Sequence, residues 1–75
     1  MNVGHASTDE LANAVRSARR ELGISQDVLA ATAGVGARFV VELEAGKRTV
    51  QLDKVLCVLD VLGIEMRFAR TSHGA

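Results

Sequence analysis

Basic side chains gather in the middle of this 75-residue chain, where the chemistry they offer is the binding of anions. The whole sequence carries nine basic and nine acidic residues and has no net charge. Between positions 16 and 48, however, the basic residues outnumber the acidic ones by six to four; the six are Arg16, Arg19, Arg20, Arg38, Lys47 and Arg48. This small excess weakly favours a polyanionic partner such as DNA, but it cannot assign a function alone.

No group of residues in the sequence has the composition of a catalytic or metal centre. The serines lack the neighbouring histidine and acid of a nucleophilic triad, and the run at residues 34–36 lacks the strand that precedes a dinucleotide-binding glycine loop. His5 and His73 lie near opposite ends, without the cysteine cluster of a structural zinc site. We therefore expect no enzymatic activity, no cofactor, no metal and no small-molecule substrate.

The length of the chain predicts one domain with a small core, and such domains are often stabilised by oligomerisation, a metal or disulfides. The single Cys57 excludes an internal disulfide, so oligomerisation is the expected support. No apolar run approaches the length that spans a membrane, and the first residues do not resemble a signal peptide. We therefore expect a cytoplasmic protein without a membrane partner.

Four amphipathic segments with start and stop signals predict four helices and an all-α fold. The first follows the capping-box sequence at residues 7–10 and ends before Gly23. The others are predicted at residues 26–33, at residues 37–45, and from Val50 or Gln51 to residue 62. The side chains expected to face the core are Leu11, Val15, Ala18, Leu22, Leu29, Ala30, Ala33, Val40, Leu43, Leu52, Val55, Leu56, Cys57, Leu59 and Leu62.

The period of the sequence changes after Gly63, where apolar residues begin to alternate with polar or small ones. Period two predicts a strand at residues 64–70. A lone strand has no ladder partner within its own chain, so we predict a homodimer in which this strand pairs with its copy. The dimerisation residues are Ile64, Met66 and Phe68; the alternative is an unstructured amphipathic tail. The resulting organisation is a flexible arm at 1–7, one domain at 8–70 and a flexible tail at 71–75.

The second and third predicted helices are short and are joined by a tight, glycine-bearing turn, which is the pattern of a helix-turn-helix unit. An alanine-rich second helix allows close packing, and glycine allows a backbone conformation that other residues resist. The third helix is then expected to project from the domain and to fit a DNA major groove, which is about 12 Å wide.

Several runs resemble the Cro/C1-type (XRE) repressor family: RRELGISQ at 19–26, LA at 29–30, AGV at 33–35 and LEAGKR at 43–48. The resemblance covers about residues 9–62. The runs DELANAV at 9–15 and LGIEMRF at 62–68 are also similar to HipB-type antitoxins. Those are small repressors that bind a kinase-like toxin, control their own operon and pair a C-terminal strand across the dimer. The resemblance implies a compact, four-helix, lambda-repressor-like domain with such a strand.

The resemblance implies that the third helix reads bases with the side chains opposite its core residues. Arg38 suits guanine because arginine can bind O6 and N7 together, and Glu42 can accept from cytosine N4. Ala37 and Val41 are placed to contact a thymine methyl group. As an alternative, Arg38 and Glu42 are four residues apart and can pair with each other in the free protein. Phe39 departs from the small polar residue common in the family; we expect it to pack beneath the helix, the alternative being contact with the sugar–phosphate backbone.

The remaining roles implied by the resemblance concern phosphates and stability. Gln26 begins the second helix, where its amide and the backbone N–H groups can hold a phosphate. Phosphate contacts are also expected of Lys47, Arg48 and Thr49, with Arg16 and Arg20 adding long-range attraction. Arg19 and Glu44 are expected to form a structural, partly buried salt bridge between the first and third helices.

The sequence thus predicts a DNA-binding repressor that binds a palindromic operator as a dimer, with a HipA-like kinase toxin as a possible partner. One alternative is a helix-turn-helix module for protein contact with weak or no DNA binding, which the zero net charge and the apolar run at 39–41 favour. Others are a phage-type repressor without a toxin and a restriction–modification controller.

Overall fold

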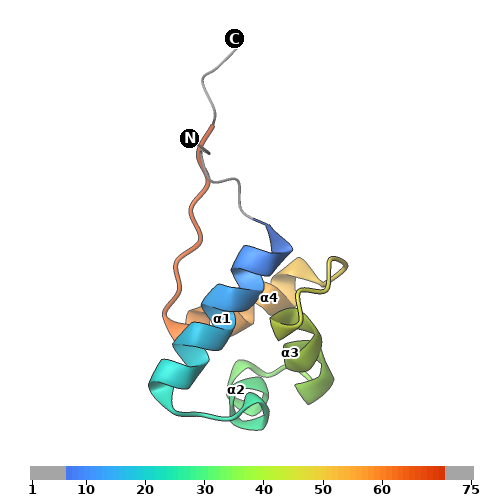
Figure 1. Ribbon diagram of the computed structural model, residues 1–75, viewed down its shortest axis with the longest axis vertical. Coiled ribbons are helices and arrows are strands. Elements are labelled where there is room, and N and C mark those ends of the chain that lie inside the picture. The colour runs from blue at the N-terminus through green and yellow to red at the C-terminus, as the bar shows by residue number, and fades with distance from the viewer. Residues whose placement is uncertain (1–6, 71–75) are drawn as a thin grey trace.

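The computed structural model describes residues 7–70, and within this range the chain forms four helices. In chain order these are α1 (Thr8–Leu22), α2 (Gln26–Ala33), α3 (Ala37–Glu44) and α4 (Leu52–Leu62). Helices α1 and α2 each pack against both α3 and α4 (Figure 1). The predicted all-α, four-helix architecture is confirmed. The tail predicted at 71–75 and residues 1–6 of the predicted arm lie outside the described residues.

The helix ends follow from local hydrogen bonding. The Ser7 hydroxyl accepts from the Glu10 backbone N–H at 3.1 Å, and the Glu10 carboxylate accepts from the Ser7 N–H at 3.0 Å, which completes the predicted capping box. Gly23 ends α1 with a φ of 70°. Two bounds differ from the prediction: α3 ends at Glu44, one residue early, and α4 begins only at Leu52.

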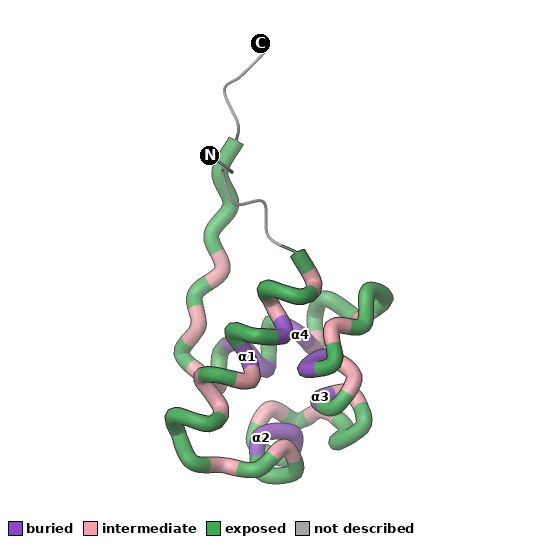
Figure 2. The backbone as a smooth tube through the Cα atoms, viewed as in Figure 1, coloured by how far each residue is buried: buried purple, intermediate pink, exposed green. Residues whose placement is uncertain are grey.

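The core is a single cluster to which all four helices contribute. Its fully buried large side chains are Val15, Leu29, Val40, Leu43, Val55 and Val58. Figure 2 shows that the buried backbone positions lie on the facing sides of the helices. Burial of these branched apolar side chains supplies the main driving force for folding.

The prediction of core residues was wrong at the end of α1 and on part of α4. Leu22 is 55% exposed, Leu52 is 58% exposed, and Leu56 is 44% exposed. Cys57, expected in the core, is also exposed, whereas its neighbour Val58 is completely buried. Val55 and Leu59 of the predicted stripe are buried, so the buried face of α4 is shifted from that stripe toward Val58. Leu22 and Leu52 lie at helix ends where no element covers them.

Replacing Cys57 with serine is expected to change the free energy of unfolding by less than about 0.5 kcal/mol, because the thiol is already in water. The neighbouring Val58→Ala substitution should cost roughly 1–3 kcal/mol through lost burial and a cavity. Thermal and urea denaturation of the two variants measure both effects. An equal or larger loss for Cys57→Ser would place the thiol in the core.

Residues 64–70, the described part of the segment after α4, carry neither helix nor ladder in the single chain. This segment leaves the end of α4, passes beside α1 and then continues beyond the helices (Figure 1). Ile64 and Met66 are half-buried against the core, whereas Phe68 is 84% exposed. Since a strand needs a partner, the predicted pairing across a dimer stays a prediction.

None of the described helices is long and apolar enough to cross a membrane. Within residues 7–70 no three histidine, cysteine or acidic side chains gather in a potential metal site.

Candidate nucleic-acid interface

The turn between α2 and α3 sets the direction in which α3 leaves the domain. Gly34 adopts a left-handed conformation with a φ of 74°, which a side chain would strain. The Val35 N–H donates to the Ala30 carbonyl at 3.0 Å and closes the end of α2. After Gly36, α3 buries one side against the core and exposes the other. Its exposed residues are Ala37, Arg38 and Val41, and the C-cap residue Ala45 is also exposed.

Glu42 lies between two basic side chains at the edge of this exposed face. Its carboxylate is 3.2 Å from Lys47 Nζ and 3.5 Å from Arg38 Nε. The alternative that Arg38 and Glu42 pair in the free protein is thus realised. The hydrogen bond from Lys47 is the main reason that the pKa of Glu42 lies below its ordinary value. The Arg38 side chain remains 89% exposed, and such surface ion pairs are weak enough for a polyanion to displace.

A polar hollow beside α3 brings together half of the side chains predicted to contact DNA. Arg38, Glu42, Lys47 and Thr49 all line it. Phe39 forms part of its wall and packs against the core, as predicted. The sequence analysis missed Lys54, a lining residue from α4 whose Nζ lies 5.9 Å from the centre of the Phe39 ring. This distance suits a cation–π contact and places a further positive charge at the hollow.

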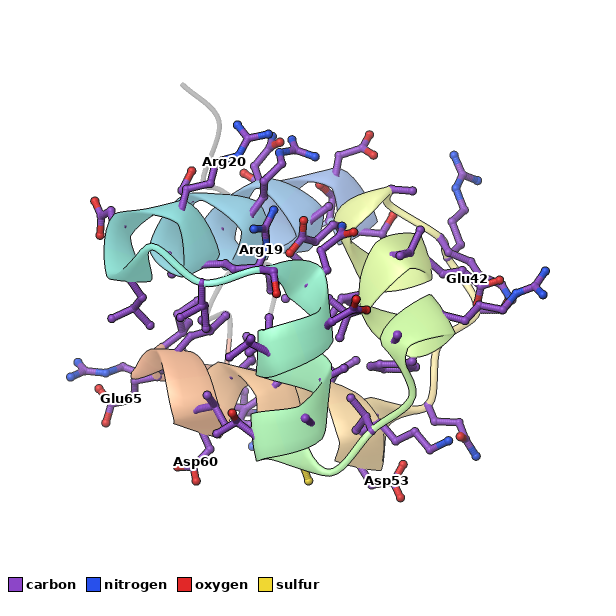
Figure 3. All side chains as sticks on the ribbon, turned by 90° about the horizontal axis from the view of Figure 1, so that it is seen from below. Arg19, Arg20, Glu42, Asp53, Asp60 and Glu65 are labelled. Carbon is purple, nitrogen blue, oxygen red and sulfur yellow. The ribbon has the colours of Figure 1, made fainter. Side chains whose placement is uncertain are left out.

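On the other side of α3, Arg19 and Glu44 form an ion pair between α1 and α3. Arg19 Nε and Nη2 donate to the two Glu44 carboxylate oxygens at 2.6 and 3.0 Å. Figure 3 shows Arg19 pointing in among the helices, while Glu42 lies on the outer side of α3. The side chains are 13% and 4% exposed, so the pair is shielded from water.

Two further side chains join this ion pair, and the sequence analysis had assigned both of them elsewhere. Gln26 Nε2 donates to Glu44 Oε1 at 3.0 Å, so one N–H of the amide predicted to hold a phosphate is engaged inside the protein. Arg16 Nη1 donates to the Glu44 carbonyl at 2.8 Å. Gln26 and Arg16 line a second hollow with Arg20, Val41 and Ala45, on the side of α3 away from Lys47. The predicted phosphate contacts therefore flank α3 on both sides.

The ionisation of Glu44 couples stability to pH. Burial raises the pKa of Glu44, but the hydrogen bonds from Arg19 and Gln26 outweigh it and bring the pKa below its ordinary value. A carboxyl whose pKa is lower in the folded state stabilises the fold above its unfolded pKa of about 4.3. That contribution is lost as the pH falls through the folded pKa.

We expect the free energy of unfolding to fall steeply below about pH 4.5, and to fall less in the Glu44→Gln variant, which has no proton to bind there. Urea denaturation between pH 3 and pH 7 measures both curves. Glu42→Gln is the matched control on the same helix, with its carboxyl far more exposed. Equal pH dependence of wild type and Glu44→Gln would show that Glu44 is not the coupled group.

Comparisons with known proteins agree with this geometry. Residues 15–68 match the family model described as helix-turn-helix. The uncharacterized HTH-type transcriptional regulator y4mF of Sinorhizobium fredii (strain NBRC 101917 / NGR234) is 59% identical over 49 residues. The match covers 65% of this chain and 64% of that protein, so the chain spans less than two thirds of this relative.

Two solved structures share the fold over nearly the whole chain. A chain in a HipA–HipB–O2–O3 complex has a TM-score of 0.79 at 24% identity, and a chain in a HipB–O4 20mer complex has 0.79 at 22%. Each alignment covers 95% of this chain and 100% of the other. At such identities the likeness establishes the four-helix fold. Since the family model spans residues from α1 to beyond α4, this protein belongs to the helix-turn-helix family of the Cro/C1 (XRE) type.

Proposed function

We propose that this protein is a sequence-specific DNA-binding repressor that binds a palindromic operator as a homodimer. The observation that carries the proposal is the exposed outer face of α3, which stands opposite the buried Val40 and Leu43 with basic side chains on both flanks. A helix presented in this way can enter a major groove while its flanks contact phosphates. Membership of the helix-turn-helix family and the 59% identity to a transcriptional regulator support the same reading.

In this proposal, the outer face of α3 reads the bases. Arg38 is the main candidate because its exposed guanidinium can bind guanine O6 and N7 together. Glu42 accepts from cytosine N4 after DNA displaces Lys47 and Arg38. Ala37 and Val41 contact thymine methyl groups, for which the 47% exposure of Val41 leaves room.

The residues on either side of α3 bind the phosphates. Lys47, Arg48 and Thr49 are exposed just after the helix. Gln26 lies at the start of α2, where backbone N–H groups point outward and the helix dipole attracts anions. Because Glu44 occupies one N–H of the Gln26 amide, the second amide N–H and the backbone complete its phosphate contact.

More specifically, we propose that this protein is the antitoxin of a HipA/HipB-like operon. Its support is the resemblance at residues 9–15 and 62–68 together with the fold shared with HipB structures, one of which contains HipA. In this form the dimer blocks transcription of its own operon, and a HipA-like kinase toxin binds a surface other than α3. The protein would then act in the cytoplasm, on the nucleoid.

Arg38→Ala is expected to weaken binding to the DNA upstream of the protein's own gene by about 1–3 kcal/mol for each guanine that Arg38 reads. Arg38→Lys is the matched variant, because it keeps the charge and loses the planar fork. Fluorescence anisotropy at one salt concentration, with upstream and scrambled duplexes, measures the specific affinity. If the Arg38→Lys variant kept full specificity, Arg38 would contact a phosphate and not a base. Absence of specific binding by wild type at low salt would overturn the repressor proposal.

A second candidate function is a helix-turn-helix module for protein contact. The observations that favour it are the zero net charge and two half-exposed valines, Val28 and Val41, on the helix-turn-helix unit. A phage-type repressor without a toxin partner is the alternative within the DNA-binding class.

A further inference from the structure

The polar hollow beside α3 holds one acidic side chain among several basic ones. Of the described residues that line it, Arg38, Lys47 and Lys54 are basic and only Glu42 is acidic. The Glu42 side chain is 33% exposed, against 45% for Lys47 and 89% for Arg38, so the carboxylate is more shielded than the two cations that bind it. A phosphate that approaches these cations therefore meets the Glu42 carboxylate at short range.

The backbone after α3 holds Lys47 against this carboxylate. Gly46 takes a left-handed conformation with a φ of 85°, and the Lys47 N–H donates to the Glu42 carbonyl at 3.1 Å. The turn brings Lys47 Nζ to 3.2 Å from the Glu42 carboxylate. Arg38 Nε reaches the same carboxylate at 3.5 Å from one turn earlier on α3. The pairing of Glu42 with both cations is thus built into the last turn of α3 and the loop that follows it.

The charge at this end of α3 depends on those contacts. Glu42 and Glu44 both lie in the last turn of α3, which has no basic residue of its own, and the helix dipole adds a partial negative charge there. Arg19 neutralises Glu44 inside the protein, whereas Glu42 relies on its surface partners. Lys47 above all holds the pKa of Glu42 below its ordinary value, so the carboxylate is ionised at neutral pH. Removal of the two cations would leave a negative charge beside the face proposed to bind DNA.

DNA has to take both partners away from Glu42 before it can bind them. Breaking two surface ion pairs costs little, but a carboxylate left unpaired beside phosphates is repelled by them, and like charges brought together at an interface suppress wrong complexes. A duplex that offers only its phosphates leaves this repulsion uncompensated. A duplex that presents a cytosine N4 amino group gives the Glu42 carboxylate a new donor.

We infer that Glu42 is a specificity-determining residue that excludes non-cognate DNA, an inference that rests on the DNA-binding function proposed above. Glu42 competes with phosphates for Lys47 and Arg38 on every duplex, and only a sequence that satisfies both Arg38 and Glu42 overcomes this competition. Exclusion differs from base reading. A base contact adds affinity for the operator, whereas exclusion lowers the affinity for all other sequences.

The Glu42→Gln variant tests this inference, because it removes the charge and keeps the shape and an amide oxygen that can still accept from cytosine. Asp60→Asn is the matched control, since it makes the same change in net charge from an exposed position near the end of α4. Figure 3 shows Asp60 and Glu42 on different sides of the molecule. Fluorescence anisotropy with scrambled and upstream duplexes, at one salt concentration, measures the two affinities of each protein.

Glu42→Gln is expected to raise the affinity for the scrambled duplex by about tenfold or more, because the repulsion between carboxylate and phosphates is removed. Its affinity for the upstream duplex should stay near that of wild type, so the ratio of the two affinities falls by a similar factor. Asp60→Asn should change both affinities little, because salt screens a charge that lies far from the phosphates.

Two results would overturn the inference. If Glu42→Gln bound the scrambled duplex no more tightly than wild type does, Glu42 would not exclude DNA, and a weaker affinity for the upstream duplex would then leave it as a base contact only. If Glu42→Gln and Asp60→Asn raised the scrambled affinity equally, net charge alone would explain the effect. The repressor proposal fails separately, when wild type shows no preference for the upstream duplex, and the scrambled affinities still decide whether Glu42 repels DNA. Urea denaturation checks that both variants are folded.

Discussion

Replacing Glu44 with alanine is expected to lower the free energy of unfolding by about 3–5 kcal/mol, the usual cost of removing one partner from a buried ion pair. The substitution leaves the Arg19 guanidinium, which is 13% exposed, without its counter-charge. It also leaves the Gln26 amide without its acceptor, so contacts that join α1, α2 and α3 are lost together. Small domains are stable by only about 5–15 kcal/mol, so a large fraction of that stability is lost.

Thermal and urea denaturation measure this loss, with Glu42→Ala as the control. Glu42 lies two residues earlier on α3, and its ion pairs are at the surface, so that variant should melt close to wild type. Because Glu44 lies on the buried side of α3, the Glu44→Ala protein that remains folded at low temperature should retain most of its DNA affinity. A melting temperature equal to wild type would show that the Arg19–Glu44 pair does not stabilise the fold.

The start and end of α1 and α2 could be predicted because the signals for them are local. Ser7 and Ser25 cap the two helices with hydroxyl groups that accept backbone N–H bonds three residues later. Gly23 and Gly34 end them in the left-handed conformation. These contacts lie within a few residues of chain, so the sequence alone contains them.

The buried face of α4 could be predicted only in part, because eight of its eleven positions are apolar. The predicted stripe included Val55 and Leu59, which are buried, but also Leu52 and Leu56, which are exposed, and the sequence LDKVLCVLDVL offers a second, overlapping stripe that adds Val58. Periodicity does not decide between them. Packing does, since α1 and α2 contact α4 on the face that carries Val58.

The hydrogen bond from Gln26 to Glu44 had no sequence signal either. Gln26 and Glu44 are separated by 18 residues, and only the turn at 34–36 brings their side chains to 3.0 Å. Arg16 reaches the Glu44 carbonyl across 28 residues for the same reason. Residue type therefore indicated which side chains lie near α3, but the fold decides which of them are engaged inside the protein.

The affinity for operator DNA is expected to fall roughly a hundredfold when the salt concentration rises from 50 to 200 mM. In the proposed dimer, Lys47 and Arg48 of both subunits would place four cationic side chains beside the phosphates. Each neutralised phosphate releases counterions and adds about 0.9 to the negative slope of log affinity against log salt. Lys47 must first leave Glu42, but both side chains are at the surface, so the exchange costs little.

Anisotropy titrations at several salt concentrations measure this slope for wild type and for the double variant Lys47→Ala, Arg48→Ala. The double variant should lose most of the slope and bind all duplexes more weakly, because phosphate contacts carry no sequence information. Arg38→Lys is the control, since it keeps every charge and should change the specific affinity without changing the slope. A shallow slope in wild type would favour the protein-contact module, because a surface that binds proteins has no counterions of DNA to release. If the double variant kept a steep slope, the phosphate contacts would instead lie on the other flank of α3, where Arg16 and Arg20 line the second hollow.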